Sequence, residues 1–197
     1  SIRYKKIDFT LMEGEHNYTI SPEKFDNSER PWISPMPKEI GEVSLFRYCE
    51  IELEKENKNT ITILNVTRKI VHYPFNDSTS SFESSNSILN DVWNFCKYSV
   101  KATSYTGLYI DGDRERTPYE GDSYINQLCH YSVDREFTMA RASMEFVIFD
   151  ACWPTEWLLL TIHLAWIDYY YTGDISFLEH YYSELKNKSL LPLIDKY

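Results

Sequence analysis

The sequence predicts a chain in two parts, a β-rich first part and a second part built from helical hairpins. Two observations predict this division. Apolar and polar residues alternate in several runs before residue 75, whereas from residue 88 the apolar residues recur with a period of about 3.6. Between the two regions, residues 76–87 form a polar stretch dense in Ser, Thr and Asn. We therefore expect a β-rich domain over residues 1–75 and a helical domain over residues 76–197.

The first part contains several candidate strands. Residues 44–53, 60–66 and 69–73 show the alternation, and the aromatic and β-branched content, of half-buried strands. Residues 2–12 and 16–20 are further candidates for short strands. Together these runs predict the closing strands of an antiparallel β domain.

The second part predicts successive helices joined by short loops. Ser85 or Asn86 can cap the first helix, and Asp122 or Ser123 the second. Gly173, followed by Asp174, is typical of a tight turn between two helices. The expected helices cover residues 88–101, 123–132, 135–149, 156–172 and 175–186, with a further helix beginning at 190. This succession predicts an array or toroid of helical hairpins.

Composition excludes several classes of function. A net charge of −10 leaves no basic surface for nucleic acid, and no run is long and apolar enough to span a bilayer. The four cysteines are scattered singly, so we expect free buried thiols, no metal site and no cofactor. The chain has no signal peptide or initial Met, and we expect it to be a piece of a longer protein. The cellular compartment and the oligomeric state stay open.

The most informative stretch is the acidic loop 109–122, YIDGDRERTPYEGD. Pro118 lacks a backbone N–H and the two glycines lack a Cβ, so one continuous helix or a central strand is excluded. An ordered loop of this kind between regular elements is a common place for catalysis and binding. Its five carboxylates are Asp111, Asp113, Glu115, Glu120 and Asp122.

The acidic residues and the aromatic content can also be interpreted as purely structural features. Asp122 is a helix cap in many proteins, and the run DRER is often a solvated loop with weak ion pairs. Glu156 begins a helix, where a carboxylate favours the macrodipole. The aromatic content of 16% suits sugar stacking, but most rings are expected in the core. The whole tract, with a Trp-flanked glutamate downstream, favours a functional site.

Several tracts together resemble the bacterial α-L-rhamnosidases of glycoside hydrolase family 78, from about residue 43 to the end. They are SLFRYCEIEL at 44–53, DGDRERTPYEGD at 111–122, WPTEW at 153–157 and YYYTGDISFLEHYY at 169–182. The resemblance implies a β-sandwich followed by the first hairpins of an (α/α)6 barrel, the six-hairpin glycosidase toroid. It also implies hydrolysis of terminal α-L-rhamnosyl residues with inversion of configuration.

The same resemblance assigns roles to residues. Glu115 would be the general acid that protonates the oxygen of the departing group. The family's general base lies in a later hairpin and is not found in these 197 residues, so we expect the chain alone to be inactive. Arg114 replaces an acid of the family pattern, which leaves open whether Asp111 or Asp113 takes the leading position. The residues implied to contact the sugar are Asp111, Arg116, Tyr119, Asp122, Trp153 (or Trp157 in its place) and Glu156.

Two alternatives to a rhamnosidase remain. One is a related six-hairpin glycosidase that acts on another deoxy or uronic sugar. The other is a carbohydrate-binding or helical scaffold protein that keeps the fold without the reaction. The expected partner is a carbohydrate substrate, a rhamnoside, and the aglycone and linkage are not determined.

Overall fold

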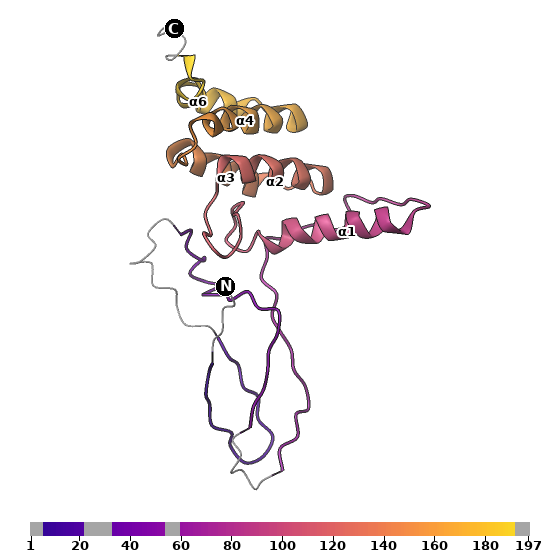
Figure 1. Ribbon diagram of the computed structural model, residues 1–197. Helices are drawn as coiled ribbons and strands as arrows, with labels where there is room; N and C mark the ends of the chain where they lie inside the picture. The colour runs from indigo at the N-terminus through magenta and orange to yellow at the C-terminus, as the bar shows by residue number, and fades with distance from the viewer. Residues whose placement is uncertain (1–5, 22–32, 54–59, 192–197) are drawn as a thin grey trace.

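The computed structural model describes residues 6–21, 33–53 and 60–191. All its regular elements are helical and lie in the second part of the chain (Figure 1). They are α1 (Ser87–Ala102), α2 (Glu120–Val133), α3 (Thr138–Phe149), the 3-10 turn η1 (Thr155–Trp157), α4 (Leu158–Thr172), α5 (Ser176–His180) and α6 (Tyr182–Lys188). These helices are consistent with the expected array of helical hairpins.

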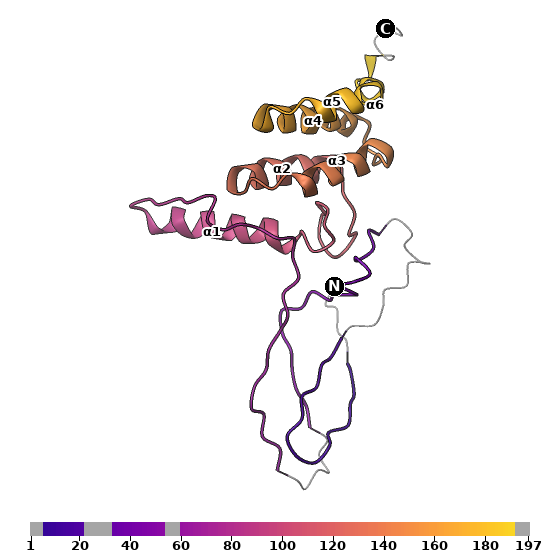
Figure 2. The ribbon, with the colours of Figure 1, turned by 180° about the vertical axis from the view of Figure 1, so that it is seen from behind.

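The helices are stacked in layers. Figures 1 and 2 show α1 in the lowest helical layer, α2 and α3 in the next, and α4 with α5 and α6 above them. Helix α2 contacts α1, α3 and α4, and α4 contacts α5 and α6. Because α2 has neighbours on three sides, the loop that precedes it is held against the middle of the stack.

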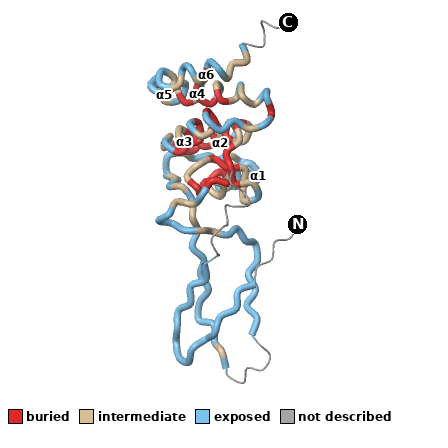
Figure 3. Tube along the Cα trace, turned by 90° about the vertical axis from the view of Figure 1, so that its left-hand side faces the viewer, coloured by how far each residue is buried: buried red, intermediate tan, exposed pale blue. Residues whose placement is uncertain are grey.

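Two apolar clusters form the core, and both belong to the helical part (Figure 3). The first joins α3, α4, α5 and α6 through Met144, Val147, Ile148, Leu164, Ala165, Phe177 and Leu185. The second joins the α1–α2 loop to α2 and α3 through Tyr109, Tyr131, Met139 and Ala140. The second cluster holds Tyr109, at the start of the acidic loop, against α2 and α3.

Local sequence signals explain several helix ends. Asn86 caps α1 as expected, because its side-chain oxygen accepts a hydrogen bond from the Ile88 backbone N–H at 3.0 Å. Gly173 ends α4 in the left-handed conformation, with φ 71°, that glycine adopts without strain. Asp174 accepts from the Ser176 backbone N–H at 3.0 Å at the start of α5.

Other helix ends differ from the prediction. Helix α2 begins at Glu120, after an extended Tyr119, and neither Asp122 nor Ser123 caps it. The helix expected over 175–186 is two helices, α5 and α6, which meet at the non-helical Tyr181. The further helix expected from residue 190 lies largely outside the described residues.

The predicted antiparallel β-sandwich portion is wrong for the described residues, none of which is in a strand. The described parts of 44–53, 60–66 and 69–73 run as extended chain with exposed apolar side chains, Tyr48 being 86% exposed and Leu64 71%. Alternation creates a strand only where a neighbouring strand pairs with the backbone and a second layer covers the apolar face. Among the described residues, no backbone hydrogen bond joins these segments to one another. The boundary at residues 75 and 76 stays a prediction.

Helix α1 shows the same limit of pattern reasoning. Its apolar stripe, which includes Ile88, Val92 and Phe95, is exposed, and Val100 is its one buried residue. No described element covers the stripe, so the amphipathic pattern predicted the helix correctly without showing which face would pack. None of the described helices combines the length and apolarity needed to cross a membrane.

Candidate active site

The acidic loop is anchored to the helices that follow it. The Tyr109 backbone N–H donates to the Ser143 hydroxyl of α3 at 2.8 Å. The Tyr109 hydroxyl lies 2.6 Å from Nδ1 of His130 on α2. Tyr109 and Ile110 are almost completely buried. Because these residues lie directly before Asp111, the first acid of the loop starts from a fixed position.

Residues 111–117 close on themselves. The Asp111 backbone N–H donates to the Thr117 carbonyl, and the Thr117 N–H donates to a carboxylate oxygen of Asp111, both at 3.4 Å. Gly112 has φ 141° and Arg116 has φ 53°, conformations that let the chain reverse within so few residues. A positive φ at a non-glycine residue is a local strain that is common at functional sites. The closed loop carries Glu115, whose side chain is 36% exposed.

Four of the predicted residues lie together: Asp111, Glu115, Tyr119 and Asp122. Burial, a hydrogen bond to Glu115 and the charges of Glu115 and Asp111 raise the pKa of the Tyr119 hydroxyl to about 12. Burial and the charges of Glu115 and Asp122 raise the pKa of Asp111. Burial and the charge of Glu115 also raise the pKa of Asp122. Glu115 is therefore the common neighbour of two partly desolvated carboxyl groups and a phenol.

Arg116 lies next to this group but its side chain contacts the N-terminal segment. Its guanidinium is 3% exposed and donates to Oε1 of Glu42 at 2.7 Å. Its carbonyl accepts from the Ser34 backbone N–H at 2.8 Å, and the guanidinium carbon lies 5.3 Å from the centre of the Tyr105 ring. Arg116 thus joins residues 34–42 to the acidic loop.

A second loop, residues 150–157 with the short turn η1 at its end, packs on the start of α2. Glu120 is fully buried, and its carboxylate accepts from the Cys152 backbone N–H at 3.2 Å and lies 2.5 Å from the Cys152 sulfur. A Cβ on Gly121 would meet the Trp157 ring at 3.3 Å, so glycine lets this indole lie directly on α2. These two contacts hold the WPTEW tract beside the acidic loop.

The remaining two predicted residues, Trp153 and Glu156, lie on this second loop and are exposed, Trp153 to 89%. Within the described residues the side chain of Glu156 makes no hydrogen bond or ion pair, with Glu115 or with any other residue. Trp157 is the indole that packs against the first loop. The structure thus places Trp153 and Glu156 on the neighbouring loop, with side chains free to meet a ligand.

Sequence reasoning missed three participants: Glu42, Glu120 and Cys152. Glu42 lies 74 residues before its partner, and no local pattern could connect the two. Glu120 was counted among the acids, but nothing in the tract marked it as the buried one. Cys152 was expected to be a free, buried thiol; it is free, but it lies against the Glu120 carboxylate. Cys49 and Cys96 are also free, and they are exposed, whereas the sequence predicted buried thiols.

We expect the Cys152 thiol to be slow to react. Burial and the adjacent Glu120 carboxylate raise its pKa to about 12, which suppresses the nucleophilic thiolate. At pH 8, alkylation by iodoacetamide, followed by mass spectrometry, should be at least about tenfold slower at Cys152 than at the exposed Cys96. Glu120→Gln should accelerate it, because the amide has no charge. Equal rates at both cysteines would contradict the contact.

We expect Asp122→Asn to raise the melting temperature at pH 7. The pKa of Asp122 is raised in the folded chain, so folding favours the protonated carboxyl. The stability that Asp122 contributes is therefore present at low pH and is lost as the pH rises through its folded-state pKa, whereas the neutral Asn side chain loses nothing. The difference between Asp122→Asn and the parent chain should disappear in acid. Asp174→Asn is the matched control: hydrogen bonds from Ser176 lower the pKa of Asp174, so its substitution should lower the melting temperature at pH 7. The same sign for both variants would contradict this assignment.

No group of three or more His, Cys, Asp or Glu side chains in the described residues is arranged to hold a metal ion. The site instead gathers carboxylates and a phenol beside an indole, on loops that precede stacked helices. This combination of fold and site defines the class of helical-hairpin glycoside hydrolases.

Comparison with known families agrees with this class. A family profile described as the bacterial alpha-L-rhamnosidase 6 hairpin glycosidase domain matches residues 77–190, which is more than half of the chain. The chain belongs to this family. No curated protein and no solved structure matches it. The resemblance drawn from the sequence motifs is confirmed, and with it a carbohydrate as the class of substrate.

Proposed function

We propose that the protein is an inverting α-L-rhamnosidase with Glu115 as its general acid. Membership of a glycosidase family supports the hydrolase class, and the specificity and the residue roles are our proposal. The observation that carries it is the position of Glu115, which adjoins Asp111, Tyr119 and Asp122 at once. Glycoside hydrolysis needs a carboxylic acid beside the leaving oxygen within a polar pocket that fits the sugar.

Each residue then has a task. Glu115 gives its proton to the glycosidic oxygen as the bond to the anomeric carbon breaks, and the leaving group departs as a neutral alcohol. Asp111 and Asp122 accept hydrogen bonds from sugar hydroxyls, which a partly desolvated carboxylate binds strongly. Tyr119 keeps its phenolic proton at neutral pH and donates it in a hydrogen bond. Asp113 is the alternative to Asp111 in the leading position.

The other three residues act around this centre. Arg116 orients the acidic loop through Glu42 and supports the sugar contact from behind. On the second loop, Trp153 offers an exposed indole face for the apolar side of a sugar, and Glu156 offers an exposed carboxylate for hydroxyl groups.

Inversion requires a second carboxylate, about 6.5–9.5 Å from the acid, that activates water on the opposite face of the sugar. We assign no residue of this chain to that role and infer that the base lies outside the 197 residues. The purified 197-residue chain should therefore bind rhamnosides without hydrolysing them. Hydrolysis by this chain would contradict the assignment of the base.

A panel of 4-nitrophenyl glycosides tests the specificity in a longer form of the protein that includes the base. We expect release of nitrophenol from the α-L-rhamnoside with at least about tenfold higher kcat/KM than from other sugars, since loss of one well-placed sugar contact costs about 1.4 kcal/mol. Proton NMR of the first-formed sugar should show inverted configuration. Preference for another sugar would identify a related six-hairpin glycosidase, and no turnover of any member would favour a binding protein.

A further inference from the structure

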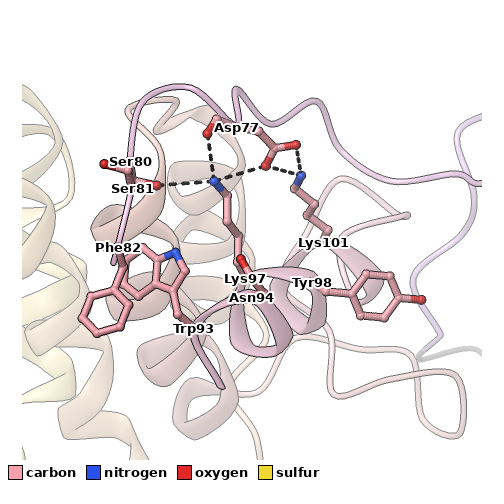
Figure 4. Close-up of a pocket in the computed structure, with 9 residues that line it drawn as sticks. All are labelled: Asp77, Ser80, Ser81, Phe82, Trp93, Asn94, Lys97, Tyr98 and Lys101. Carbon is pink, nitrogen blue, oxygen red and sulfur yellow. Dashed lines mark hydrogen bonds and ion pairs between the residues drawn. The ribbon is translucent and has the colours of Figure 1, made fainter. Parts of the chain in front are cut away.

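A hollow lies between α1 and residues 77–82, away from the acidic loop (Figure 4). Its volume is about 460 Å³, within the range of small-molecule sites in proteins. It shares no residue with the acidic loop or the WPTEW tract. The hollow is therefore a separate feature that the proposed hydrolysis does not use.

One wall of the hollow is a closed ionic group. Lys97 donates to the Asp77 carbonyl at 3.0 Å and lies 3.2 Å from an Asp77 carboxylate oxygen, and Lys101 bonds to the same carboxylate. Both lysine side chains are largely buried, at 13% and 17% exposure. Their contacts with Asp77 fix residues 77–82 along α1, and the paired charges give an anionic ligand little to gain.

A second wall is aromatic. Phe82 and Trp93 are stacked, with ring centroids 5.4 Å apart and an angle of 25° between the planes. Phe82 keeps 44% of its surface exposed, so the pair still offers a ring surface to a ligand. Figure 4 shows the two rings side by side next to the ionic group. Flat aromatic surfaces of this kind bind the C–H face of a pyranose ring.

The rest of the lining carries polar side chains that can form hydrogen bonds with a ligand. Ser81, Asn94 and Tyr98 line the hollow and are exposed, and their side chains make no hydrogen bond within the described residues. They supply two hydroxyl groups and an amide, which both donate and accept hydrogen bonds, as sugar hydroxyls do. An aromatic surface bordered by such groups suits a ligand that has one apolar face and a ring of hydroxyls.

We propose that this hollow is a second, non-catalytic carbohydrate site that binds a neutral pyranose. The sugar stacks on Phe82 and Trp93 and exchanges hydrogen bonds with Ser81, Asn94 and Tyr98. Since none of these residues belongs to the acidic loop, the site does not depend on the proposed hydrolysis. It would hold a sugar unit of a larger glycan while another unit occupies the acidic loop.

The test is a titration of the ¹⁵N-labelled 197-residue chain with methyl α-L-rhamnopyranoside and methyl β-D-glucopyranoside, observed at the tryptophan indole N–H signals. The Trp93 signal reports binding in the hollow, whereas the signals of Trp153 and Trp157 report binding at the second loop, beside the acidic loop. We expect the Trp93 signal to shift and saturate in the millimolar range with at least one of these sugars. Shifts at Trp153 and Trp157 alone would support the proposed function and overturn the second site. Shifts at Trp93 alone would support the second site and count against sugar binding at the acidic loop.

Matched variants test the contacts. Phe82→Ala should weaken the sugar affinity measured at the Trp93 signal by about tenfold, which corresponds to about 1.4 kcal/mol for the lost aromatic contact, and Phe82→Tyr should restore it. Phe149→Ala, at another exposed phenylalanine, is the control and should have no effect. Asn94→Ala provides a second variant at an exposed position where the fold is not at risk. A Trp93 response that Phe82→Ala and Asn94→Ala leave unchanged, or tighter binding of a uronate than of neutral sugars, would overturn the proposal.

Discussion

Glu115→Gln is expected to lower kcat for an alkyl α-L-rhamnoside by at least about 10²–10⁴-fold, the usual contribution of a general acid. The amide keeps the shape of the side chain and can still accept from Arg114, which lies 2.5 Å from Glu115, but it has no acidic proton to give. Binding should persist, because the hydrogen bonds that Asp111 and Asp122 accept from the sugar, and the one that Tyr119 donates to it, do not need that proton. The measurement requires a form of the protein that hydrolyses rhamnosides.

The leaving group makes this experiment sharper. A nitrophenolate departs without protonation far more easily than an alkoxide, so the variant should lose much less activity on a nitrophenyl rhamnoside than on an alkyl rhamnoside. Glu145→Gln is the matched control, since Glu145 is a glutamate on α3 that bonds to Tyr181 and has no proposed part in the reaction. An equal loss on both substrates, or unchanged turnover, would remove Glu115 from the acid role.

Asp168→Ala is expected to destabilise the chain by about 3 kcal/mol, because one partner of a buried ion pair is removed. Asp168 on α4 is fully buried and accepts from the Tyr131 hydroxyl at 2.5 Å and from Nε of Arg141 at 3.1 Å. These contacts join α2 and α3 to α4. The alanine would leave the buried Tyr131 hydroxyl without its partner, while the partly exposed Arg141 retains Asp174 and access to water.

Urea unfolding of the 197-residue chain, followed by circular dichroism, measures this loss. Asp168→Asn keeps the size of the side chain and an acceptor for Tyr131, so it should cost clearly less than the alanine. A double-mutant cycle with Arg141→Ala then separates the ion pair from the Tyr131 hydrogen bond. A loss below about 1 kcal/mol for Asp168→Ala would show that the buried pair does not hold the three helices together.

The two loops are joined by buried polar contacts as well as by apolar packing. The Glu120 carboxylate, at the first residue of α2, fixes the backbone at Cys152, and the Trp157 indole lies on Gly121. Glu120 and Gly121, which make these contacts, lie between Tyr119 and Asp122, two residues proposed to bind the sugar. Substitutions at Glu120 or Gly121 are therefore expected to move Trp153 and Glu156 relative to Glu115, without touching the sugar themselves.

Much of the helical part was predictable because its signals are local. Asn86 and Gly173 set helix ends through their own side chain or backbone conformation, and a 3.6-residue period needs only neighbouring turns of the same helix. The acidic tract likewise stood out by its residue types, and the family match over residues 77–190 confirms the family that the motifs indicated. The break between α5 and α6 at Tyr181 had no comparable signal.

The sequence by itself determined most of the helices, the position of the acidic loop and the glycosidase family, since each depends on residues close together in the chain. Only the tertiary structure decided that the alternating runs of the first part form no strand among the described residues, and that Arg116 binds Glu42. It also decided which acid is buried against Cys152. These features depend on which distant segments meet, because a strand needs a partner and a charge is buried only where another group compensates it.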